Sequence, residues 1–314
     1  TVTTISLSGN YPFPDKASLK HANDIFSSIP DDSIVIVDGL AFGAMKSVTE
    51  LHKGRIHLIA LCHHPLAMET GLDTLHKNLF LESESHAFQC ATHIIVTSRN
   101  TRKILVESFA IADSKITVAP PGTSSFRFAK CEGFPPNLLT CASLTQRKGH
   151  DVLIEAFRKI KHLNWHARFV GDETLDPLWA SELRNKVKIN GLIDRVEFIG
   201  MVEYLSPEYQ DADIFVLPSR FEGYGMVLSE ALAHGLPIIS TCAGAIPEVV
   251  PESAGILIEP GNHSALANAL EKVITDHKLR LRMQLSAQKI SSTLPSWKRC
   301  AELVVRGLNT VSKK

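Results

Sequence analysis

The sequence contains no long apolar run. No stretch approaches the roughly 18 consecutive apolar residues that a membrane-spanning helix requires. An excess of charge of either sign is also missing, since 33 Lys and Arg residues balance 33 Asp and Glu residues. A neutral chain has no general attraction for nucleic acid, so we expect no nucleic-acid partner. Hydrophobic residues make up 44% of the chain, which is enough for ordinary folded domains and excludes a disordered protein.

Several short motifs of common enzymes are absent as well. There is no CxxC pair, no HExxH, no G-x-S-x-G and no G-x-G-x-x-G, so we expect no metal, no hydrolase nucleophile and no nicotinamide or other cofactor. In a chain of this size, cysteines without metal-ligand spacing are typical of reduced, mostly buried thiols in the cytoplasm. The six cysteines are Cys62, Cys90, Cys131, Cys141, Cys242 and Cys300.

Short apolar runs alternate with segments of helical periodicity almost throughout. The runs are continuous, as expected for strands of a parallel sheet that is covered on both faces. Strand–helix alternation of this kind predicts doubly wound α/β sheets. The predicted strands lie at residues 34–37, 57–62, 93–98, 115–120, 138–143, 167–172, 196–200, 213–219, 236–241 and 254–260.

One segment interrupts this rhythm. PPGTSSFRFAKCEGFPPN, residues 120–137, is rich in Pro, Gly and Ser and carries no periodicity, so it is interpreted as an interdomain linker. Two α/β domains joined in this way leave a cleft at the carboxyl ends of their strands, where such folds bind ligands. We therefore predict a first domain at 1–122, a linker at 123–137, a second domain at 138–295 and a C-terminal helix within 296–314 that packs back on the first domain.

The stretch FEGYGMVLSEALAHGLP, residues 221–237, connects a predicted strand to a predicted helix. From spacing alone, two interpretations of its glutamates stay equally open. Glu222 is a solvated side chain and Glu230 an ordinary residue of the first helical turns, or both accept hydrogen bonds from sugar hydroxyls on either side of a diphosphate. In the second interpretation, the phosphate binds free amides at the helix start, where glycines let the backbone approach a ligand. The positions concerned are Gly223, Gly225, Met226 and Val227.

The longer run SRFEGYGMVLSEALAHGLPIISTCAGAIPEVV resembles the glutamate-x7-glutamate signature of the retaining glycosyltransferases of family 4. The flanking segments SLTQRKGHDVLIEAF, FVGD, RVEFIGMV, ADIFVLPS and AGILIEPGN follow in the family's order, so the resemblance covers the whole second domain. VDGLAFGA, LCHHPLAMETGL and KITVAPPGT are similar to first-domain segments. The resemblance implies the GT-B fold, in which two Rossmann-like domains face each other across a cleft. It also implies transfer of a sugar from a nucleotide diphosphate sugar to a hydroxyl, with retention of anomeric configuration.

The resemblance assigns roles to individual residues of the second domain. Lys148 matches the lysine that binds the donor diphosphate, with Arg147 beside it, while Ser143 stands where many relatives carry another basic residue. Glu230 matches the glutamate that accepts from the ribose, and Glu222 the one that contacts the donor sugar. Family analogy places nucleobase contacts on the backbone of Met201 and Val202.

Two further motifs are interpreted through the same resemblance. In the family a histidine at the position of His63 and His64 reaches the donor sugar, and we favour His63. Asp211-Ala212-Asp213 spells the DxD string of a different, metal-dependent architecture, but it precedes a strand where this family has a structural aspartate. We therefore expect no metal at Asp211 and Asp213.

The resemblance implies a cytoplasmic enzyme without a protein nucleophile, whose acceptor is lipid-linked or a saccharide and which contacts membranes peripherally. Glycolipid or polysaccharide biosynthesis is the expected context. Two alternatives stay open: a nucleotide-sugar epimerase on the same fold, and a non-catalytic sugar-nucleotide-binding protein.

The first residues lack one family feature. TVTTISLSGNYPFP resembles the family's second strand and the turn after it, without the Gly-rich loop that normally precedes. We therefore expect the chain to lack the N-terminal strand, Gly-rich loop and helix of the fold, roughly 40 residues, and to expose a strand edge of its first sheet.

Overall fold

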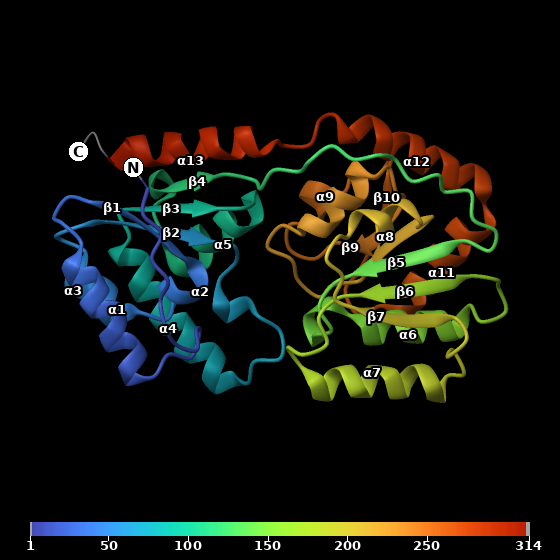
Figure 1. Ribbon diagram of the computed structural model, residues 1–314, viewed down its shortest axis with the longest axis horizontal. Helices are drawn as coiled ribbons and strands as arrows, with labels where there is room; N and C mark the ends of the chain where they lie inside the picture. The colour runs from blue at the N-terminus through green and yellow to red at the C-terminus, as the bar shows by residue number, and fades with distance from the viewer. Residues whose placement is uncertain (1, 312–314) are drawn as a thin grey trace. The chain divides into compact units, whose positions relative to one another are not determined.

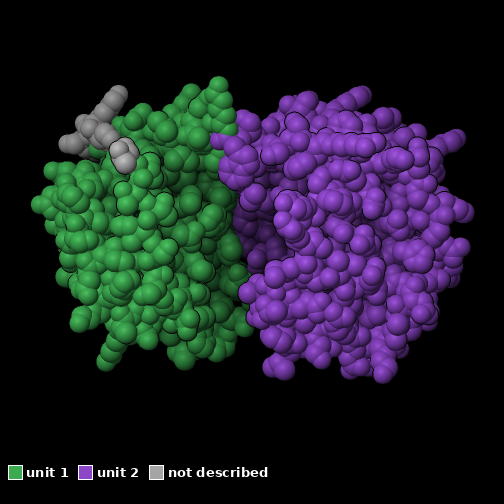
Figure 2. All heavy atoms as spheres, in the orientation of Figure 1, with its two compact units in different colours: residues 1–120, 298–314 green, residues 121–297 purple. Residues whose placement is uncertain are grey.

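The computed structural model describes residues 2–311, which form two compact α/β units (Figure 1). The chain divides after Pro120 and again after Trp297, so the C-terminal segment from Lys298 returns to unit 1. Residues 121–297 form unit 2, drawn in purple in Figure 2. The sequence placed these divisions at residues 122 and 295, and the residues of its predicted linker, 123–137, belong here to unit 2.

Unit 1 contains a four-stranded parallel sheet in the order β1-β2-β3-β4. Successive side chains of β2 point to opposite faces: Leu58 and Ala60 pack against helices α1 to α5, while Ile59 packs against helix α13. Strand β1 lies at the sheet edge. The elements are α1 (Lys16–Ser28), β1 (Ile34–Asp38), α2 (Gly39–Phe42), α3 (Lys46–His52), β2 (His57–Cys62), η1 (Leu66–Met68), α4 (Thr74–Cys90), β3 (His93–Val96), α5 (Arg99–Phe109), η2 (Asp113–Lys115), β4 (Ile116–Val118) and α13 (Trp297–Val311).

Unit 2 contains a six-stranded parallel sheet in the order β10-β9-β8-β5-β6-β7. One face packs against α6, α7 and α11, and the other against α8, α9, α10 and α12. The elements are β5 (Asn137–Cys141), η3 (Gln146–Lys148), α6 (His150–Lys159), β6 (His166–Val170), α7 (Pro177–Ile189), β7 (Val196–Gly200), α8 (Ser206–Gln210), β8 (Ile214–Leu217), α9 (Met226–Ala233), β9 (Ile238–Thr241), α10 (Ile246–Val249), β10 (Gly255–Ile258), α11 (His263–Thr275) and α12 (His277–Ser291).

The strand order of unit 2 reverses at its centre. From β5 the chain runs outward through β6 and β7, then returns to β8 on the other side of β5 and continues through β9 and β10. At such a switch point, the loops after the two neighbouring strands diverge and leave room for a ligand. The loops after β5 and β8 are therefore where this fold places a binding site.

The segment at residues 121–136 carries no helix or strand, yet it is tied to unit 2 by hydrogen bonds. The amide of Ala129 donates to the carbonyl of His234 at 2.8 Å. The carboxylate of Asp213, 2% exposed, accepts from the amides of Gly133 and Asn137, each at 2.7 Å. Asp213 thus joins this segment to strand β8, and both of its oxygens are used in doing so.

The N-terminal segment differs from the prediction. The stretch TVTTISLSGNYPFP resembles a family strand and the turn after it, but the structure has no strand in residues 2–14, and Val2 is 94% exposed. The segment alternates polar and apolar residues and gains no neighbouring strand to satisfy its backbone groups, so its β propensity alone does not fix a strand. At the edge strand β1, Ile34 and Ile36 are 41% and 46% exposed.

None of the helices in the described residues is both long enough and apolar enough to span a membrane.

His150, the first residue of α6, is buried without a polar partner. Its side chain is 0% exposed, its ring packs edge-on against Phe169, and neither ring nitrogen has a hydrogen-bond partner among the described residues. Burial, together with the nearby charge of Lys148, lowers the pKa of His150 from 6.5 to about 4. The imidazole is therefore neutral in the folded chain at neutral pH.

We expect this histidine to make unit 2 sensitive to acid. Because the pKa is lower in the folded state, unfolding takes up a proton once the pH falls below the unfolded value of 6.5, and stability declines from there towards pH 4. The loss between about pH 7 and pH 5 is on the order of 2 kcal/mol. Urea unfolding at both pH values should show this loss in the parent and a clearly smaller one in His150→Phe. His166→Gln, at an exposed position of β6, should keep the parent's loss. Equal losses in parent and His150→Phe would contradict the prediction.

Candidate functional site

The loops that follow β5 and β8 lie against each other in unit 2. Gly149 has a φ of +72°, and a Cβ atom at this position would lie 2.1 Å from the carbonyl oxygen of Pro218. Glycine is therefore required twice, for the left-handed backbone and for the close approach. The amide of Arg220 donates to the carbonyl of Arg147 at 2.7 Å, and its guanidinium binds both carboxylate oxygens of Asp151 at 2.9 and 2.7 Å. These contacts fix the two loops as one surface.

Glu222 lies at the centre of this surface. It is 5% exposed, and its carboxylate is held by three side chains. Lys148 Nζ lies 2.6 Å from Oε1, Arg147 Nη1 lies 3.2 Å from Oε2, and the Ser219 hydroxyl donates to Oε1 at 2.7 Å. Arg147 also donates to the carbonyl of Phe221 at 3.1 Å. The three predicted residues Glu222, Lys148 and Arg147 are thus brought together, with Ser219 as a partner that the sequence did not indicate.

The charge state of Glu222 follows from its surroundings. Burial acts to raise the pKa of Glu222, but the charges of Lys148 and Arg147 and the hydrogen bonds from Lys148 and Ser219 outweigh it, and the pKa lies below its ordinary value. The carboxylate is therefore ionised at neutral pH. The site holds two cationic side chains within reach of one buried anion, so it carries a local excess of positive charge.

Helix α9 begins at the same loop. Gly225 precedes it with a φ of +87°, and no side chain caps the helix start. Met226, the first residue of α9, is 40% exposed. Gly244, with a φ of +57°, packs closely against the backbone of this loop, since a Cβ there would lie 2.2 Å from the carbonyl oxygen of Glu222. An uncapped helix start beside two cations is suited to bind an anionic group such as a phosphate. Gly223 lies in this loop and Val227 in the first turn of α9, and their role in binding a phosphate stays a prediction.

Glu230 lies on α9 and is positioned by a buried tyrosine. Tyr209, 1% exposed, donates its hydroxyl to Glu230 Oε2 at 3.0 Å and stacks on His234 with ring centroids 4.7 Å apart. Partial burial raises the pKa of Glu230, against the lowering effect of the hydrogen bond from Tyr209. The sequence did not indicate Tyr209, because a residue on α8 reaches α9 only through tertiary packing.

The predicted nucleobase contacts lie after β7. Met201 is 72% exposed and Val202 is half-buried. The backbone contacts proposed for these two residues stay predictions.

His63 and His64 follow β2 in unit 1, and each contacts a carboxylate. His63 Nε2 lies 3.0 Å from Asp38 Oδ2, and this hydrogen bond lowers the pKa of Asp38. His64 Nε2 lies 3.2 Å from Glu69 Oε2. The side chain of His63 is 53% exposed and that of His64 20%. Their proposed contact with a donor sugar is not tested by these distances.

A buried carboxylate anchors the loop that carries these histidines. Glu84 on α4 is 1% exposed and accepts from the amides of Leu66 and Ala67 at 2.6 and 3.0 Å. Burial raises the pKa of Glu84 to about 7, although the two amide hydrogen bonds act in the opposite direction. The sequence contained no signal for this residue, because it lies in the middle of an ordinary helical segment.

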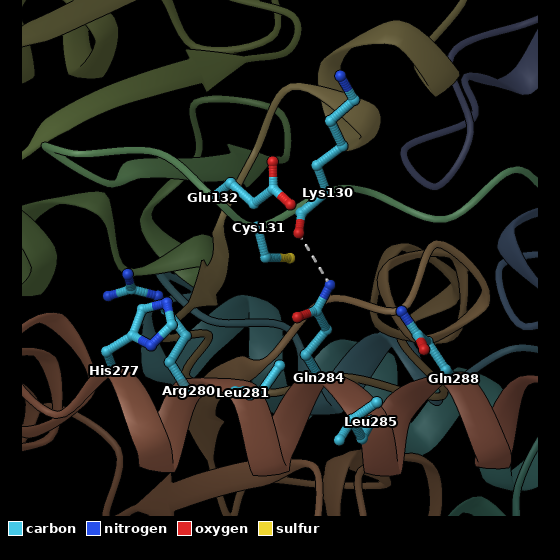
Figure 3. Close-up of a pocket in the computed structure, with 9 residues that line it drawn as sticks. All are labelled: Lys130, Cys131, Glu132, His277, Arg280, Leu281, Gln284, Leu285 and Gln288. Atoms are coloured by element: carbon cyan, nitrogen blue, oxygen red, sulfur yellow. Dashed lines mark hydrogen bonds between the residues drawn. The ribbon is translucent and has the colours of Figure 1, made fainter.

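A separate cavity of about 320 Å³ in unit 2 contains none of the predicted site residues (Figure 3). It lies between α12 and residues 130–132, and Gln284 crosses it to bind the carbonyl of Lys130 at 3.1 Å. The buried guanidinium of Arg280 donates instead to the carbonyls of Val273 and Ile274, in the last turn of α11. The residues that line this cavity include neither Glu222 nor Lys148.

Comparison with known proteins supports the assignment of the second half of the chain. Residues 135–276 match the sequence profile of the family described as Glycosyl transferases group 1. The mannosylfructose-phosphate synthase of Agrobacterium fabrum is 29% identical, a match that covers 61% of this chain and 45% of the relative. A capsular polysaccharide biosynthesis glycosyltransferase of Staphylococcus aureus is also 29% identical, over 63% of this chain and 56% of the relative. The chain thus spans about half the length of these curated relatives.

Solved structures extend the similarity to both units. The sucrose-phosphate synthase of Thermosynechococcus elongatus superposes with a TM-score of 0.80 at 21% identity, over 95% of this chain and 79% of that one. HepE of Anabaena, solved in complex with UDP and glucose, gives a TM-score of 0.78 at 19% identity, over 92% of this chain and 81% of that one. The predicted fold is confirmed: the chain has the two parallel-sheet α/β domains of the GT-B glycosyltransferases.

The network at Glu222 gives a direct test by mutation. Glu222→Gln keeps the shape of the side chain but removes the buried charge that pairs with Lys148 and Arg147, and we expect unit 2 to lose on the order of 3 kcal/mol of stability at neutral pH. Glu252→Gln, at an exposed position of the same unit, is the matched control and should change little. Urea unfolding followed by circular dichroism measures both. A loss in Glu222→Gln no larger than in the control would show that solvent already screens the two cations.

Proposed function

We propose that this protein moves a sugar from a nucleoside diphosphate sugar to an acceptor hydroxyl, with retention at the anomeric carbon. The match of residues 135–276 to the family described as Glycosyl transferases group 1 supports the transferase part of this proposal. One observation carries the proposal: the two cations Lys148 and Arg147 meet the buried Glu222 beside the uncapped start of α9. This arrangement lies at the switch point of the sheet, where α/β folds bind nucleotides.

The cations would act on the leaving group. When the bond between the anomeric carbon and the diphosphate breaks, negative charge grows on the departing phosphate oxygens, and a preorganised cation lowers the free energy of that state. Lys148 and Arg147 are already held in place by Glu222 and need little rearrangement to meet the diphosphate. In the proposed front-face reaction, the acceptor hydroxyl bonds to the anomeric carbon on the side from which the diphosphate leaves, and a diphosphate oxygen takes the hydroxyl proton. No protein nucleophile takes part.

The second carboxylate would hold the nucleoside. Tyr209 donates to Oε2 of Glu230, which fixes the side chain on α9 and leaves Oε1 to accept from the ribose hydroxyls. Glu222 would contact the donor sugar on the other side of the diphosphate. HepE, whose fold is similar, was solved with UDP and glucose, which supports a nucleoside diphosphate as the donor part.

The proposed acceptor rests on a relative of the chain, and the proposed compartment on the state of its cysteines. The Staphylococcus aureus relative acts in capsular polysaccharide biosynthesis, and we propose a saccharide or lipid-linked acceptor in such a pathway here. All six cysteines are free thiols, which supports the reducing conditions of the cytoplasm. We propose that the reaction needs no metal, because the carboxylate of Asp213 is engaged by two backbone amides.

The proposal is tested by incubating the full chain with a panel of nucleotide sugars, with and without saccharide and lipid-linked acceptors. Release of free nucleoside diphosphate with a glycosylated product supports it, and the anomeric configuration of the product decides between retention and inversion. Epimerised donor without acceptor would show an epimerase, and binding without turnover a non-catalytic protein. Addition of EDTA should leave donor binding and transfer unchanged, while a strict need for Mg²⁺ or Mn²⁺ would overturn the metal-independent mechanism.

Glu230 should determine nucleotide affinity. If its carboxylate accepts from the ribose, Glu230→Gln weakens binding of the nucleoside diphosphate by roughly 1–3 kcal/mol, the usual loss for a hydrogen bond to a charged group. Calorimetric titration of the parent and the variant measures this, with Glu252→Gln as the control of equal charge change. An unchanged dissociation constant would refute the assignment.

Lys148 should determine the rate of transfer. Lys148→Ala is expected to lower turnover on the order of 10²-fold, because it removes a stabilising charge from the transition state. Lys148→Arg should restore activity only in part, since a planar guanidinium does not replace a compact ammonium. Lys159→Ala, exposed on α6, is the control and should keep full turnover. Near-normal turnover in Lys148→Ala would indicate that Arg147, and not Lys148, stabilises the charge on the leaving diphosphate.

A further inference from the structure

Three side chains that can bind metals meet in unit 1, outside the residues used above: Glu50 and His86 are exposed, and Cys90 is buried beneath them. His86 and Cys90 lie one helical turn apart on α4, so they point to the same face of that helix. Helix α3 packs against α4 and contributes Glu50. Glu50 Oε2 lies 2.9 Å from His86 Nε2 and 3.1 Å from Cys90 Sγ. The three ligand atoms all lie within 4.8 Å of one another.

We propose that Glu50, His86 and Cys90 form a zinc site that joins α3 to α4, with water in the fourth position. Imidazole nitrogen, thiolate sulfur and carboxylate oxygen are the ligands that zinc takes in proteins. With bonds of about 2.0–2.3 Å in a tetrahedron, such ligands lie roughly 3.2–3.7 Å apart. The observed separations of 2.9 and 3.1 Å come within about 1 Å of this, so small side-chain rotations suffice.

The surroundings of the cluster are compatible with a cation of this kind. Lys53 pairs with Glu50 at 2.6 Å, but through Oε1, while His86 and Cys90 both approach Oε2. The Lys53 side chain is 49% exposed and can turn into solvent when a cation binds. On binding, the Cys90 thiol loses its proton to solvent, and one sulfur–zinc bond replaces one sulfur–hydrogen bond. The net charge of the three ligands then falls to −2, which matches a divalent ion.

The chain offers a matched comparison in unit 2. Cys242 Sγ lies 3.3 Å from Glu259 Oε1, so this pair repeats the thiol–carboxylate contact at an exposed position. No cluster of three possible metal ligands forms around it among the residues that the structure describes. A thiol and a carboxylate without a third ligand should not bind zinc tightly. The Cys242–Glu259 pair therefore serves as the control for metal binding by such a pair.

The experiment uses the full chain, stripped with a chelator and titrated with Co²⁺ as a spectroscopic substitute for Zn²⁺. We expect one equivalent to bind with a thiolate-to-cobalt charge-transfer band in the near ultraviolet and visible bands of a four-coordinate site, both displaced by Zn²⁺. Cys90→Ser should abolish the charge-transfer band. His86→Asn should weaken Zn²⁺ binding on the order of 10²-fold or more, since changes even outside the ligand set cost 10–100-fold. Cys242→Ser should behave as the parent.

Circular dichroism of each variant confirms that it is folded before titration. A charge-transfer band that persists in Cys90→Ser, or that disappears in Cys242→Ser, would overturn the site. So would the absence of a thiolate band in the folded parent at saturating Co²⁺. Because the readout is a spectrum of the metal, failure of this site and failure of the proposed transferase activity are distinguishable.

Discussion

A carboxylate that is withdrawn from water needs compensating charge, and Glu222 obtains it by drawing two loops of unit 2 together. Its ion pairs with Lys148 and Arg147 connect the loop after β8 to the loop after β5. Gly149 allows this contact because it has no Cβ to meet Pro218. The two cations held by this connection lie beside the uncapped start of α9. The same interaction that folds the loops therefore also prepares the site for an anionic ligand.

The sheets could be predicted from the sequence because most of their inner strands, such as β3, β8 and β9, are buried on both faces. Runs such as residues 57–62 are continuously apolar, and the parallel strand observed there, His57–Cys62, has the same bounds. The first described segment, residues 2–14, shows the limit of this reasoning. Its composition suits a strand, but a strand exists only where a neighbour supplies hydrogen bonds, and the sequence does not say whether a neighbour is present. The order of the strands, including the reversal at β5, likewise depends on long-range pairing.

The candidate site was predictable where short motifs resemble those of a known family. Glu222 belongs to one such motif, Lys148 and Arg147 belong to another, and the structure brings these three together. Tyr209, Asp38 and Glu84 were not predictable, because each reaches its partner from another element. Each of them takes part in a hydrogen bond that involves a carboxylate, and this pairing is seen only once the tertiary contacts are known. The spacing of His86 and Cys90 is visible in the sequence, but without Glu50 on the neighbouring helix it has little meaning.

Helix α13 has a consequence for the order in which the protein acquires its structure. Leu303 and Leu308 of this helix cover the sheet face that contains Ile59 and Ile95, although about two hundred residues separate them in the chain. During synthesis at roughly 5–20 residues per second, that apolar face emerges from the ribosome well before its cover is made. Unit 2 is continuous in sequence and can fold in the interval. Unit 1 can be completed only after α13 has left the ribosomal tunnel, so nascent chains that still lack this helix present a bare hydrophobic sheet to chaperones.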